Sequence, residues 1–422
     1  MKILWLCNII LPAVSNELNL KASNKEGWLS GICDAVSKEK NFKLAICFPV
    51  PKKYAGLKWV INEIAYYGFY EDTKHPEKYD EKLEGQLKNI VDDFEPDLVH
   101  IFGTEYPHTL AMCKCIEDRP RIKSLIGFQG ILDIYKHHYF DGLPDSVINC
   151  VTFRDFIKRD SLRIQQKKYA LRAINEVEAV KKAQHVTGRT PFDKGFSEKV
   201  NPDAEYHFLN ETLRKEFYQG EWKYDKCEKH SIFLSQGNYP IKGLHVMLEA
   251  LDMLKYAYDD IKLYVAGDNV TKTETLKDKI KLSAYGKYLL KLIKEYELED
   301  RVVFLGSIDA SQIKKQLLNS NVFVCPSTIE NSPNSLGEAM ILGVPSITSN
   351  VGGISGIFER DIDGLMFDNC EAGDLAKCID DLFKDVPLQI KFSSAASLHA
   401  KKTHNSQNNY RRLVEIYEKI CK

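Results

Sequence analysis

Short apolar runs alternate with longer stretches of amphipathic, helix-like sequence along almost the whole chain. This alternation is typical of βα units, in which each strand of a parallel sheet is buried on both faces and the next segment crosses over as a helix. Ten candidate strands follow the pattern: 2–7, 43–48, 98–102, 124–128, 185–187, 231–235, 262–266, 302–305, 322–325 and 346–348. The sequence therefore predicts an α/β protein built on parallel sheets.

Length divides the pattern in two. A chain of 422 residues exceeds what one hydrophobic core usually spans, so we expect two domains. Residues 189–218 contain Asn201-Pro202 and Asn210-Glu211. We expect this stretch to form the connection between the two domains. The 58 basic and 59 acidic residues nearly balance, which gives no whole-chain case for binding nucleic acid.

The cysteines indicate the redox compartment. There are 11 of them, an odd number, and several lie in apolar runs, so unpaired thiols in a reducing cytoplasm are expected. The first 15 residues could form a secretory signal, but Asn8 interrupts their apolar run and a buried first strand is the favoured interpretation. No run approaches the roughly 20 apolar residues of a membrane-spanning helix, so any membrane contact is expected to be peripheral.

Residues 321–354 read as strand, loop, helix and strand, with Glu330 in the loop and Glu338 about a turn and a half into the helix. Ser332 is the expected N-cap and Pro333 the expected first helical residue. A helix N-terminus at the carboxyl end of a strand favours phosphate, and flanking carboxylates can accept hydrogen bonds from hydroxyls. Phosphate between two polyols describes a nucleotide-sugar. The alternative is a dipole-favoured Glu338 and a solvated Glu330.

The same segment resembles a family. E-N-S-P-N-S-L-G-E-A-M-I-L-G-V-P-S-I, residues 330–347, is similar to the E-x7-E signature of retaining glycosyltransferases of family 4, and the similarity continues through 351–353 to 363–365. The resemblance implies a GT-B fold, with two Rossmann-like domains facing across a cleft. It implies an N-terminal acceptor domain (1–205), a nucleotide-sugar donor domain (206–404) and a final helix (405–422) that packs back on the N-terminal domain.

The donor elements of the family can be placed one by one. Residues 236–243, Q-G-N-Y-P-I-K-G, resemble its G-R-L-x-x-x-K-G turn, whose arginine and lysine clamp the donor diphosphate. Lys242 matches, whereas Asn238 stands nearest the place of the arginine. Either Lys242 and the helix N-terminus at 332–335 suffice, or Arg189 or another group compensates. The implied donor contacts are Gly237, Asn238, Lys242, Gly267, Ser307, Glu330, Ser332, Asn334, Ser335 and Glu338. The alternatives are an exposed loop lysine and ordinary βα turns.

The resemblance also implies the chemistry. It implies a retaining, metal-free transfer in which the departing phosphate helps to deprotonate the acceptor hydroxyl. In this scheme Glu330 holds the donor sugar and Glu338 holds the ribose. Lys242 and the helix amides hold the diphosphate. No cofactor and no metal are expected. Asp361-Ile-Asp363 spells the metal-binding D-x-D of another fold, but here we interpret it as a polar turn.

The acceptor side departs further from the family. Residues 25–28, K-E-G-W, form a reduced version of its glycine-rich turn, and Gln129 stands where a histidine is common. Glutamine can orient a hydroxyl but cannot act as a base at neutral pH, so Gln129 is either an orienting residue or a strand-end residue without a role. The implied acceptor contacts are Gly27, Trp28, Glu105 and His108, although a satisfied surface histidine is an alternative for the last.

Residues 154–182 are predominantly basic with interleaved apolar residues, which suits contact with an anionic membrane or, alternatively, a solvated helix face. Residues 137–139 and 142–144 bear a looser resemblance to bacterial enzymes of capsular or cell-surface polysaccharide synthesis. The leading hypothesis is a cytoplasmic enzyme that moves a hexose from a UDP- or GDP-sugar to a saccharide or lipid-linked saccharide, at the inner face of the membrane. The alternatives are a sugar phosphorylase or nucleotide-sugar epimerase, and a non-enzymatic GT-B partner subunit.

Overall fold

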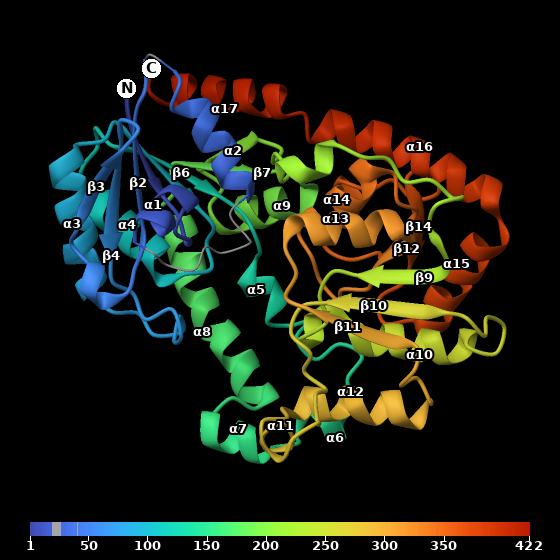
Figure 1. The fold of residues 1–422 in the computed structure, drawn as a ribbon. Coiled ribbons are helices and arrows are strands. Elements are labelled where there is room, and N and C mark those ends of the chain that lie inside the picture. The colour runs from blue at the N-terminus through green and yellow to red at the C-terminus, as the bar shows by residue number, and fades with distance from the viewer. Residues whose placement is uncertain (19–26, 40) are drawn as a thin grey trace. The chain divides into compact units, whose positions relative to one another are not determined.

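The computed structural model describes residues 1–18, 27–39 and 41–422, and these divide into two units. Unit 1 comprises residues 1–136, 168–215 and 404–422, and unit 2 comprises residues 137–167 and 216–403. Each unit is a sheet of mainly parallel strands flanked by helices, as the alternation predicts (Figure 1). The division falls after residue 215 rather than 205, and residues 137–167, which the sequence assigned to the N-terminal domain, group with unit 2.

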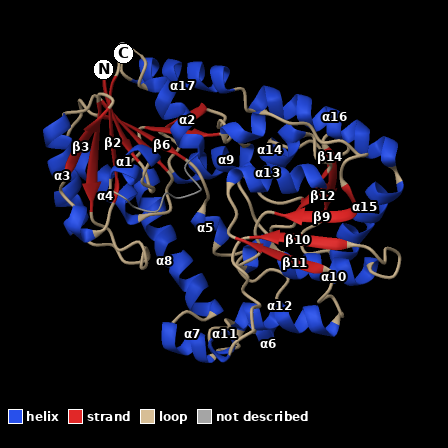
Figure 2. Cartoon of the chain, in the orientation of Figure 1, coloured by secondary structure: helices blue, strands red, loops and turns tan. Residues whose placement is uncertain are grey.

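The sheet of unit 1 has eight strands in the order β3-β4-β2-β1-β5-β6-β7-β8, parallel except for the β3–β4 pair (Figure 2). Its strands are β1 (Lys2–Leu6), β2 (Lys43–Pro49), β3 (Lys58–Ile61), β4 (Ile64–Phe69), β5 (Leu98–Phe102), β6 (Lys123–Gly127), β7 (His185–Gly188) and β8 (Glu205–Phe208). Its helices are α1 (Pro12–Glu17), α2 (Gly27–Val36), α3 (Lys82–Phe94), α4 (Pro107–Glu117), α5 (Leu132–Tyr135), α9 (Pro191–Val200) and α17 (Ser406–Ile420), and α8 (Leu162–Lys181) runs from residues of unit 2 into unit 1.

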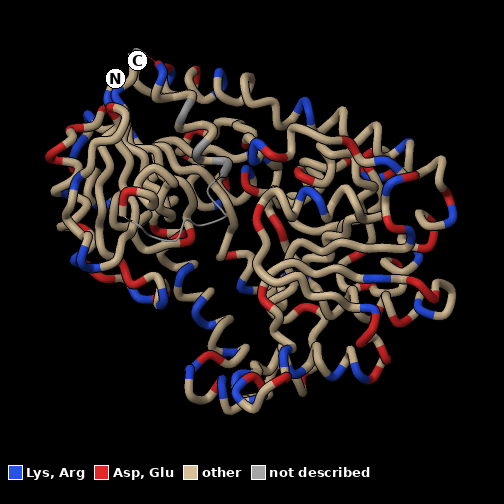
Figure 3. Tube along the Cα trace, in the orientation of Figure 1, with Lys and Arg blue, Asp and Glu red and all other residues tan. Residues whose placement is uncertain are grey.

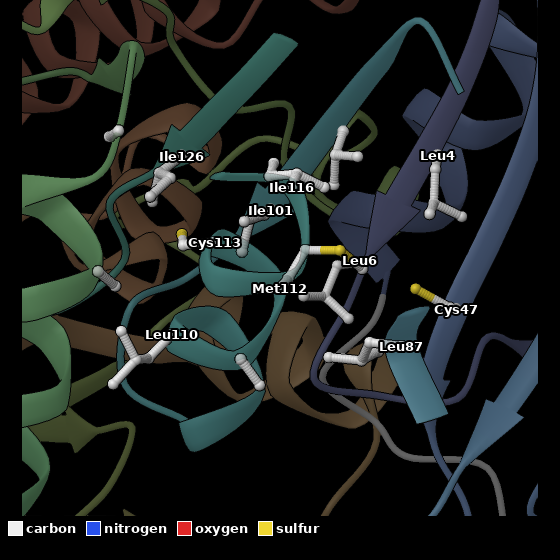
Figure 4. Close-up of a cluster of buried hydrophobic side chains, with 14 of the residues drawn as sticks. Leu4, Leu6, Cys47, Leu87, Ile101, Leu110, Met112, Cys113, Ile116 and Ile126 are labelled. Atoms are coloured by element: carbon white, nitrogen blue, oxygen red, sulfur yellow. The ribbon is translucent and has the colours of Figure 1, made fainter. Parts of the chain in front are cut away.

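Alternate residues of the central strand β1 build two separate cores. Leu4 and Leu6 point to one face, where they join a buried cluster with residues of α3, α4 and α8 (Figure 4). Ile3 and Trp5 point to the other face, where the cluster includes residues of α1, α2 and α17. Because side chains alternate along a strand, a continuous apolar run such as β1 has to be covered on both sides.

The C-terminal helix α17 lies in unit 1, within the second of these cores. Its Tyr417 is fully buried, accepts a hydrogen bond from Trp5 Nε1 at 3.0 Å and contacts His100 Nδ1 at 2.6 Å. Burial lowers the pKa of His100 to about 3, so its imidazole is neutral and can accept the hydrogen of the tyrosine hydroxyl. The end of the chain is thereby joined to strands near its beginning.

The sheet of unit 2 has six parallel strands in the order β11-β10-β9-β12-β13-β14. They are β9 (Glu228–Leu234), β10 (Lys262–Ala266), β11 (Val302–Gly306), β12 (Ser320–Cys325), β13 (Ser346–Ser349) and β14 (Gly364–Phe367). The helices are α6 (Asp145–Ile148), α7 (Phe153–Lys158), α10 (Leu244–Leu254), α11 (Leu276–Ile280), α12 (Ala284–Glu295), α13 (Ala310–Asn319), α14 (Asn334–Leu342), α15 (Ala372–Lys384) and α16 (Val386–Thr403). Helix α10 contacts α12 and α15, whereas α14 contacts α13 and α16.

Residues 137–167, here called the inserted segment, are joined to unit 2 by specific hydrogen bonds. The buried His245 of α10 contacts the Asp141 carbonyl oxygen through Nε2 at 3.1 Å and the Tyr285 hydroxyl through Nδ1 at 3.2 Å. Asp155 Oδ2 accepts a hydrogen bond of 2.8 Å from the Ala284 amide at the start of α12. These contacts explain why a segment from the first half of the chain groups with the second.

Four strands of the structure, β3, β4, β8 and β14, were not predicted from the sequence. β3 and β4 form a hairpin whose turn residues, Asn62 and Glu63, both have positive φ and lack the glycine that usually signals such a turn. β8 lies inside the stretch that we interpreted as an interdomain crossing, and β14 ends the second sheet. Both are four-residue edge strands: β8, Glu-Tyr-His-Phe, carries no continuous apolar run, and the apolar run of β14, Gly-Leu-Met-Phe, is only three side chains long.

Candidate functional site

The candidate donor residues come together at one edge of the sheet in unit 2. Strands β9 and β12 are neighbours and run parallel, so the loops that follow them leave the sheet at the same edge. Lys242 follows β9 in a short 3-10 turn (Pro240–Lys242), and Glu330 follows β12. Two residues that are 88 positions apart in the sequence are thus brought into contact.

Lys242 and Glu330 form an ion pair between Lys242 Nζ and Glu330 Oε1. Their side chains are 19% and 10% exposed, respectively, so each is largely buried but still reachable. Ser327 Oγ donates a second hydrogen bond to Glu330 Oε1 at 2.8 Å. Burial is the largest single influence on the pKa of Lys242 and lowers it, but Glu330, Tyr239 and Cys325 together raise it more, so the pKa lies well above its ordinary value. The site therefore presents a permanent ammonium beside a carboxylate.

The backbone around Glu330 is fixed by its neighbours. The Glu330 carbonyl oxygen accepts a hydrogen bond of 2.9 Å from the Gly353 amide, and the Thr328 amide donates one of 2.8 Å to the Ile241 carbonyl oxygen. Gly243 has a φ of +67°, and a Cβ there would lie 1.8 Å from the Pro326 carbonyl oxygen. Only glycine fits at that position, so the lysine turn and the glutamate loop are held at a set spacing.

Helix α14 begins one residue later than the sequence predicted. Pro333 occupies the N-cap and Asn334 is the first helical residue, so Ser332 is not the N-cap. The Leu336 amide already bonds to the Pro333 carbonyl oxygen at 3.0 Å. Ser332 Oγ is buried and has no hydrogen-bond partner among the described residues. Glu338 lies inside the helix as predicted and is 3% exposed. Glu330 is 7% exposed, so the alternative of a solvated Glu330 does not apply.

Asn238, which stands in place of the family's arginine, follows β9 and lines a pocket of about 640 Å³ in unit 2. The pocket is bounded by the loops after β9 and β10, by α11 and the start of α12, and by the inserted segment. Asn238 Oδ1 is buried and accepts no hydrogen bond in the described structure. Tyr239 lines the same pocket, and its ring centroid lies 5.7 Å from Lys242 Nζ. Tyr239 therefore lies between this pocket and Lys242, and neither Lys242 nor Glu330 lines the pocket itself.

The two remaining turns have the expected positions. Gly267 follows β10 with a φ of +96°, and its amide donates a hydrogen bond of 2.9 Å to the Gly306 carbonyl oxygen. Ser307 follows β11 and is exposed. Gly237 follows β9 and packs so closely on Leu244 that a Cβ would lie 2.7 Å from that side chain. Since β11, β10 and β9 are consecutive in the sheet, these turns line up along one edge.

The D-x-D sequence belongs to a structural turn. Asp363 is fully buried, and its Oδ2 accepts a hydrogen bond of 2.8 Å from the Glu359 amide and contacts His399 Nδ1 at 2.6 Å. That hydrogen bond to Asp363 raises the pKa of His399. Asp361 has a positive φ of 64° and is exposed. The geometry thus agrees with the interpretation of this sequence as a turn.

In unit 1, Gln129 lies at the carboxyl end of β6 and is part of a buried polar chain. Gln129 Nε2 donates to Glu211 Oε1 at 2.6 Å, and Arg189 pairs with Glu211 Oε2 at 2.6 Å. Arg189 is thus committed to Glu211 inside unit 1. Glu211 was not among the predicted site residues, although an isolated carboxylate between Leu209 and Leu213 was a signal for a role. An orienting role for Gln129 stays a prediction.

Glu105 follows the neighbouring strand β5, and its two carboxylate oxygens differ. Oε1 accepts a hydrogen bond of 2.9 Å from the Gly130 amide, whereas the buried Oε2 has no partner among the described residues. The adjacent Thr104 hydroxyl donates to the buried Glu176 of α8 at 2.6 Å. Burial raises the pKa of Glu176 to about 7. Glu105 therefore remains a candidate ligand contact at this edge of unit 1.

His108 is placed differently from its expected acceptor role. It lies in α4, is 1% exposed, and contacts Glu71 Oε2 through Nδ1 at 2.8 Å. This geometry favours the alternative of a satisfied, structural histidine. Gly27 and Trp28 open helix α2, but the structure does not describe their side chains, and residues 25 and 26 lie outside the described residues.

The basic region 154–182 forms α7 and most of α8, and many of its charges are neutralised locally. Arg154 pairs with Asp155 at 3.0 Å and Asp160 at 2.9 Å, and Lys182 pairs with Glu117 at 2.6 Å. Lysine and arginine are interspersed with acidic residues along both units (Figure 3). Among residues 1–18, 27–39 and 41–422, no helix combines the length and apolar character that spanning a bilayer requires.

Comparison with known proteins adds to this geometry. Residues 218–399 match the family model for glycosyl transferases group 1. The putative glycosyltransferase YtcC of Bacillus subtilis is 27% identical over 200 residues, 47% of each chain. The putative colanic acid biosynthesis glycosyltransferase WcaL of Escherichia coli is 29% identical over 142 residues, 32% of each chain. The chain thus spans about half the length of the first relative and about a third of the second.

A solved structure covers the whole chain. HepE of Anabaena, in complex with UDP and glucose, has a TM-score of 0.69 at 15% identity, and the match covers 99% of both chains. At this identity the likeness concerns the fold, and the predicted GT-B architecture of two Rossmann-like domains is confirmed.

Proposed function

We propose that the chain is a retaining hexosyltransferase, because residues 218–399 match the family model for group 1 glycosyl transferases. It moves a hexose from a UDP- or GDP-sugar to a saccharide or lipid-linked saccharide in the synthesis of surface polysaccharide. The name of WcaL supports the polysaccharide context. The HepE complex makes UDP-glucose the first donor to test.

The ion pair between Lys242 and Glu330 carries this proposal. An ammonium group has three N–H donors; Glu330 and the Tyr239 hydroxyl are its neighbours in the structure, so one donor remains for a phosphate oxygen. Glu330 Oε2 makes no hydrogen bond to any described residue and can accept one from a sugar hydroxyl. A cation for the diphosphate and an acceptor for the sugar therefore lie side by side, which is the arrangement that a nucleotide-sugar requires.

The proposed reaction uses these groups for binding and electrostatics. The acceptor hydroxyl attacks the anomeric carbon on the face from which the diphosphate departs, and the departing phosphate takes up its proton. Lys242 and the first amides of α14 stabilise the negative charge that develops on the phosphate, while Glu338 holds the ribose. No protein nucleophile and no metal ion take part in this scheme.

The pocket beside the pair suits the rest of the donor. Its volume of about 640 Å³ lies within the range of small-molecule sites. Arg154, Lys272 and Lys281 line it together with Asn238. Lys272 and Lys281 can contribute to neutralising the diphosphate where the family has an arginine, whereas Arg154, from the inserted segment, is already paired with Asp155 and Asp160.

A donor screen followed by a transfer assay tests the proposal. UDP- and GDP-sugars are first compared by thermal shift, because a ligand stabilises the folded state in proportion to its excess over the dissociation constant. Transfer of labelled hexose is then measured for the wild type, Lys242→Ala and Glu330→Ala, with Glu295→Ala on the exposed face of α12 as control. Unimpaired transfer by both site variants would refute the assignment. Nucleotide binding without transfer, restored by a second protein, would identify a partner subunit instead.

We also propose that unit 2 rests on anionic lipid, which suits a lipid-linked acceptor. Six apolar side chains in and around α7 and α11 are more than half exposed: Val151, Phe153, Phe156, Ile157, Leu276 and Ile280. Residues of both regions line one hollow together with Lys279, Lys287 and Lys294. Exposed apolar side chains among lysines favour the interface of an anionic bilayer.

Flotation with lipid vesicles tests this contact. The wild type should float with anionic vesicles and not with neutral ones, and the double variant Phe156→Ser/Leu276→Ser should lose that binding. Leu398→Ser is the matched control, because Leu398 is 75% exposed on α16, away from α7 and α11 in the sequence. Equal flotation of the double variant and the wild type would exclude this surface as the lipid contact.

A further inference from the structure

Two histidines and a glutamate gather at the amino-terminal ends of β7 and β8 in unit 1. His185 is the first residue of β7, and Glu205 and His207 lie on the edge strand β8. The register pairs His185 with Glu205, and Glu205 and His207 are two residues apart on one strand. Because side chains alternate along strands and paired residues share a face, the three side chains project from the same face of the sheet.

The three nearest ligand atoms form a compact triangle. His185 Nδ1 lies 3.1 Å from His207 Nε2 and 3.4 Å from Glu205 Oε2, and His207 Nε2 lies 3.9 Å from Glu205 Oε2. Tetrahedral zinc sites, with bonds of about 2.0–2.1 Å, hold their ligand atoms about 3.3–3.4 Å apart. One point lies about 2.0 Å from all three atoms of this triangle, so a single ion can reach them without movement of the strands.

The surroundings leave room for a fourth ligand. The His207 side chain is 3% exposed and that of His185 17%, whereas that of Glu205 is 43% exposed, so the triangle is open to water on the glutamate side. Lys419 of α17 binds the other oxygen of Glu205, Oε1, which leaves Oε2 for the histidines. Hydrogen bonding to the outer oxygen of a carboxylate is a usual way to orient it toward a metal.

We propose that His185, Glu205 and His207 bind a divalent transition-metal ion of the Zn²⁺ class, with water as the fourth ligand. Two imidazoles and one carboxylate favour Zn²⁺ over Mg²⁺ and Ca²⁺, which prefer oxygen ligands alone. The ion joins β7 to the edge strand β8 and stabilises the folded state by binding to it alone. Its site lies at the amino-terminal edge of the sheet, whereas Gln129 and Glu105 lie at the carboxyl-terminal edge, so the role of the ion is structural.

Metal titration of the full chain tests this site. The protein is treated with EDTA, dialysed into metal-free buffer and titrated with CoCl₂, ZnCl₂ or MgCl₂. One equivalent of Co²⁺ should bind with visible d–d absorption, and Zn²⁺ but not Mg²⁺ should raise the melting temperature. His185→Gln and Glu205→Gln should each weaken Co²⁺ binding by more than about tenfold. Removing a residue that only hydrogen-bonds to a metal ligand already lowers metal affinity by about tenfold or more, and removing a ligand should lower it at least as far.

Matched controls keep the result decisive. His75→Gln removes another histidine of unit 1 that contacts a glutamate, and it should bind Co²⁺ as the wild type does. Because Glu205 is half-exposed, Glu205→Gln should fold even where a histidine variant does not, and circular dichroism checks both. Absence of a bound equivalent in the wild type, or unchanged affinity in folded Glu205→Gln, would overturn the proposal. Intense near-ultraviolet thiolate bands would do the same, since they would assign the metal to cysteines.

Discussion

Replacing Glu330 by glutamine should change both the stability of unit 2 and its response to pH. The substitution keeps the size of the side chain but removes the charge that faces Lys242. In the wild type, burial lowers the pKa of Lys242, and Glu330, with smaller contributions from Tyr239 and Cys325, more than compensates. In Glu330→Gln, burial is the main remaining effect, so the pKa of Lys242 should fall below its ordinary value of about 10.4.

The size and sign of the effect follow from this change. Removing one partner of a buried ion pair costs about 3–5 kcal/mol, and because Lys242 is 19% exposed we expect about 3 kcal/mol near pH 6. A lysine with a lowered folded-state pKa binds fewer protons when folded than when unfolded, so stability rises with pH between the two values. In the wild type that pKa is raised, so its contribution is complete below the unfolded pKa and constant from pH 6 to 9.

Thermal unfolding at pH 6, 7.5 and 9 measures the loss of stability and its pH dependence. Nucleotide affinity over the same pH range measures the loss of charge on Lys242. Glu330→Gln should melt well below the wild type at pH 6 and recover part of the difference at pH 9. Its nucleotide affinity should fall over the same interval, because Lys242 loses its charge. Glu295→Gln is the matched control, since Glu295 pairs with Lys291 at an exposed position where a salt bridge contributes about 0–1 kcal/mol. Equal melting temperatures of Glu330→Gln and the wild type at pH 6 would refute this reasoning.

Three further outcomes are expected. Tyr417→Phe removes the hydroxyl that serves two buried hydrogen bonds, so chemical unfolding should show a loss of about 2–3 kcal/mol in unit 1; a loss below about 0.5 kcal/mol would contradict the network. Gly243→Ala places a Cβ against the Pro326 carbonyl oxygen and should weaken nucleotide binding by more than about tenfold, whereas Gly373→Ala, with nothing within 4 Å of its Cβ, should bind normally. EDTA should leave nucleotide binding unchanged, as calorimetry can verify, since the proposed donor contacts include no metal.

The fold was predictable from sequence where strands are buried on both faces. The run Ile-Leu-Trp-Leu of β1 is fully buried, and its continuous apolar character marks it as an inner strand of a parallel sheet. Glu205–Phe208 was missed because an edge strand packs on fewer neighbours: Glu205 and Phe208 are exposed, so no apolar run remains. The parts of the fold that local sequence determines were therefore found, and the sheet edges were not.

The candidate site also has a part that was predictable from local sequence and a part that was not. The loop positions of Lys242 and Glu330 followed from local patterns, but their contact depends on β9 and β12 being neighbours, which strand order alone decides. His108 was misplaced because its burial depends on Glu71, from a distant segment. Glu211 escaped notice for the same reason, since its partners are separated from it by tens of residues. Such pairings are tertiary, and one sequence holds no local record of them.

The inserted segment has a consequence for the modularity of this protein. The chain passes between the two units after residues 136, 167, 215 and 403, so neither unit corresponds to one uninterrupted stretch of the gene. A fragment of residues 216–403 alone would leave His245 without its acceptor at Asp141 and would uncover the start of α12. A single recombination event that moved residues 216–403 would therefore leave these contacts behind, and residues 137–167 would have to travel with unit 2 to keep them.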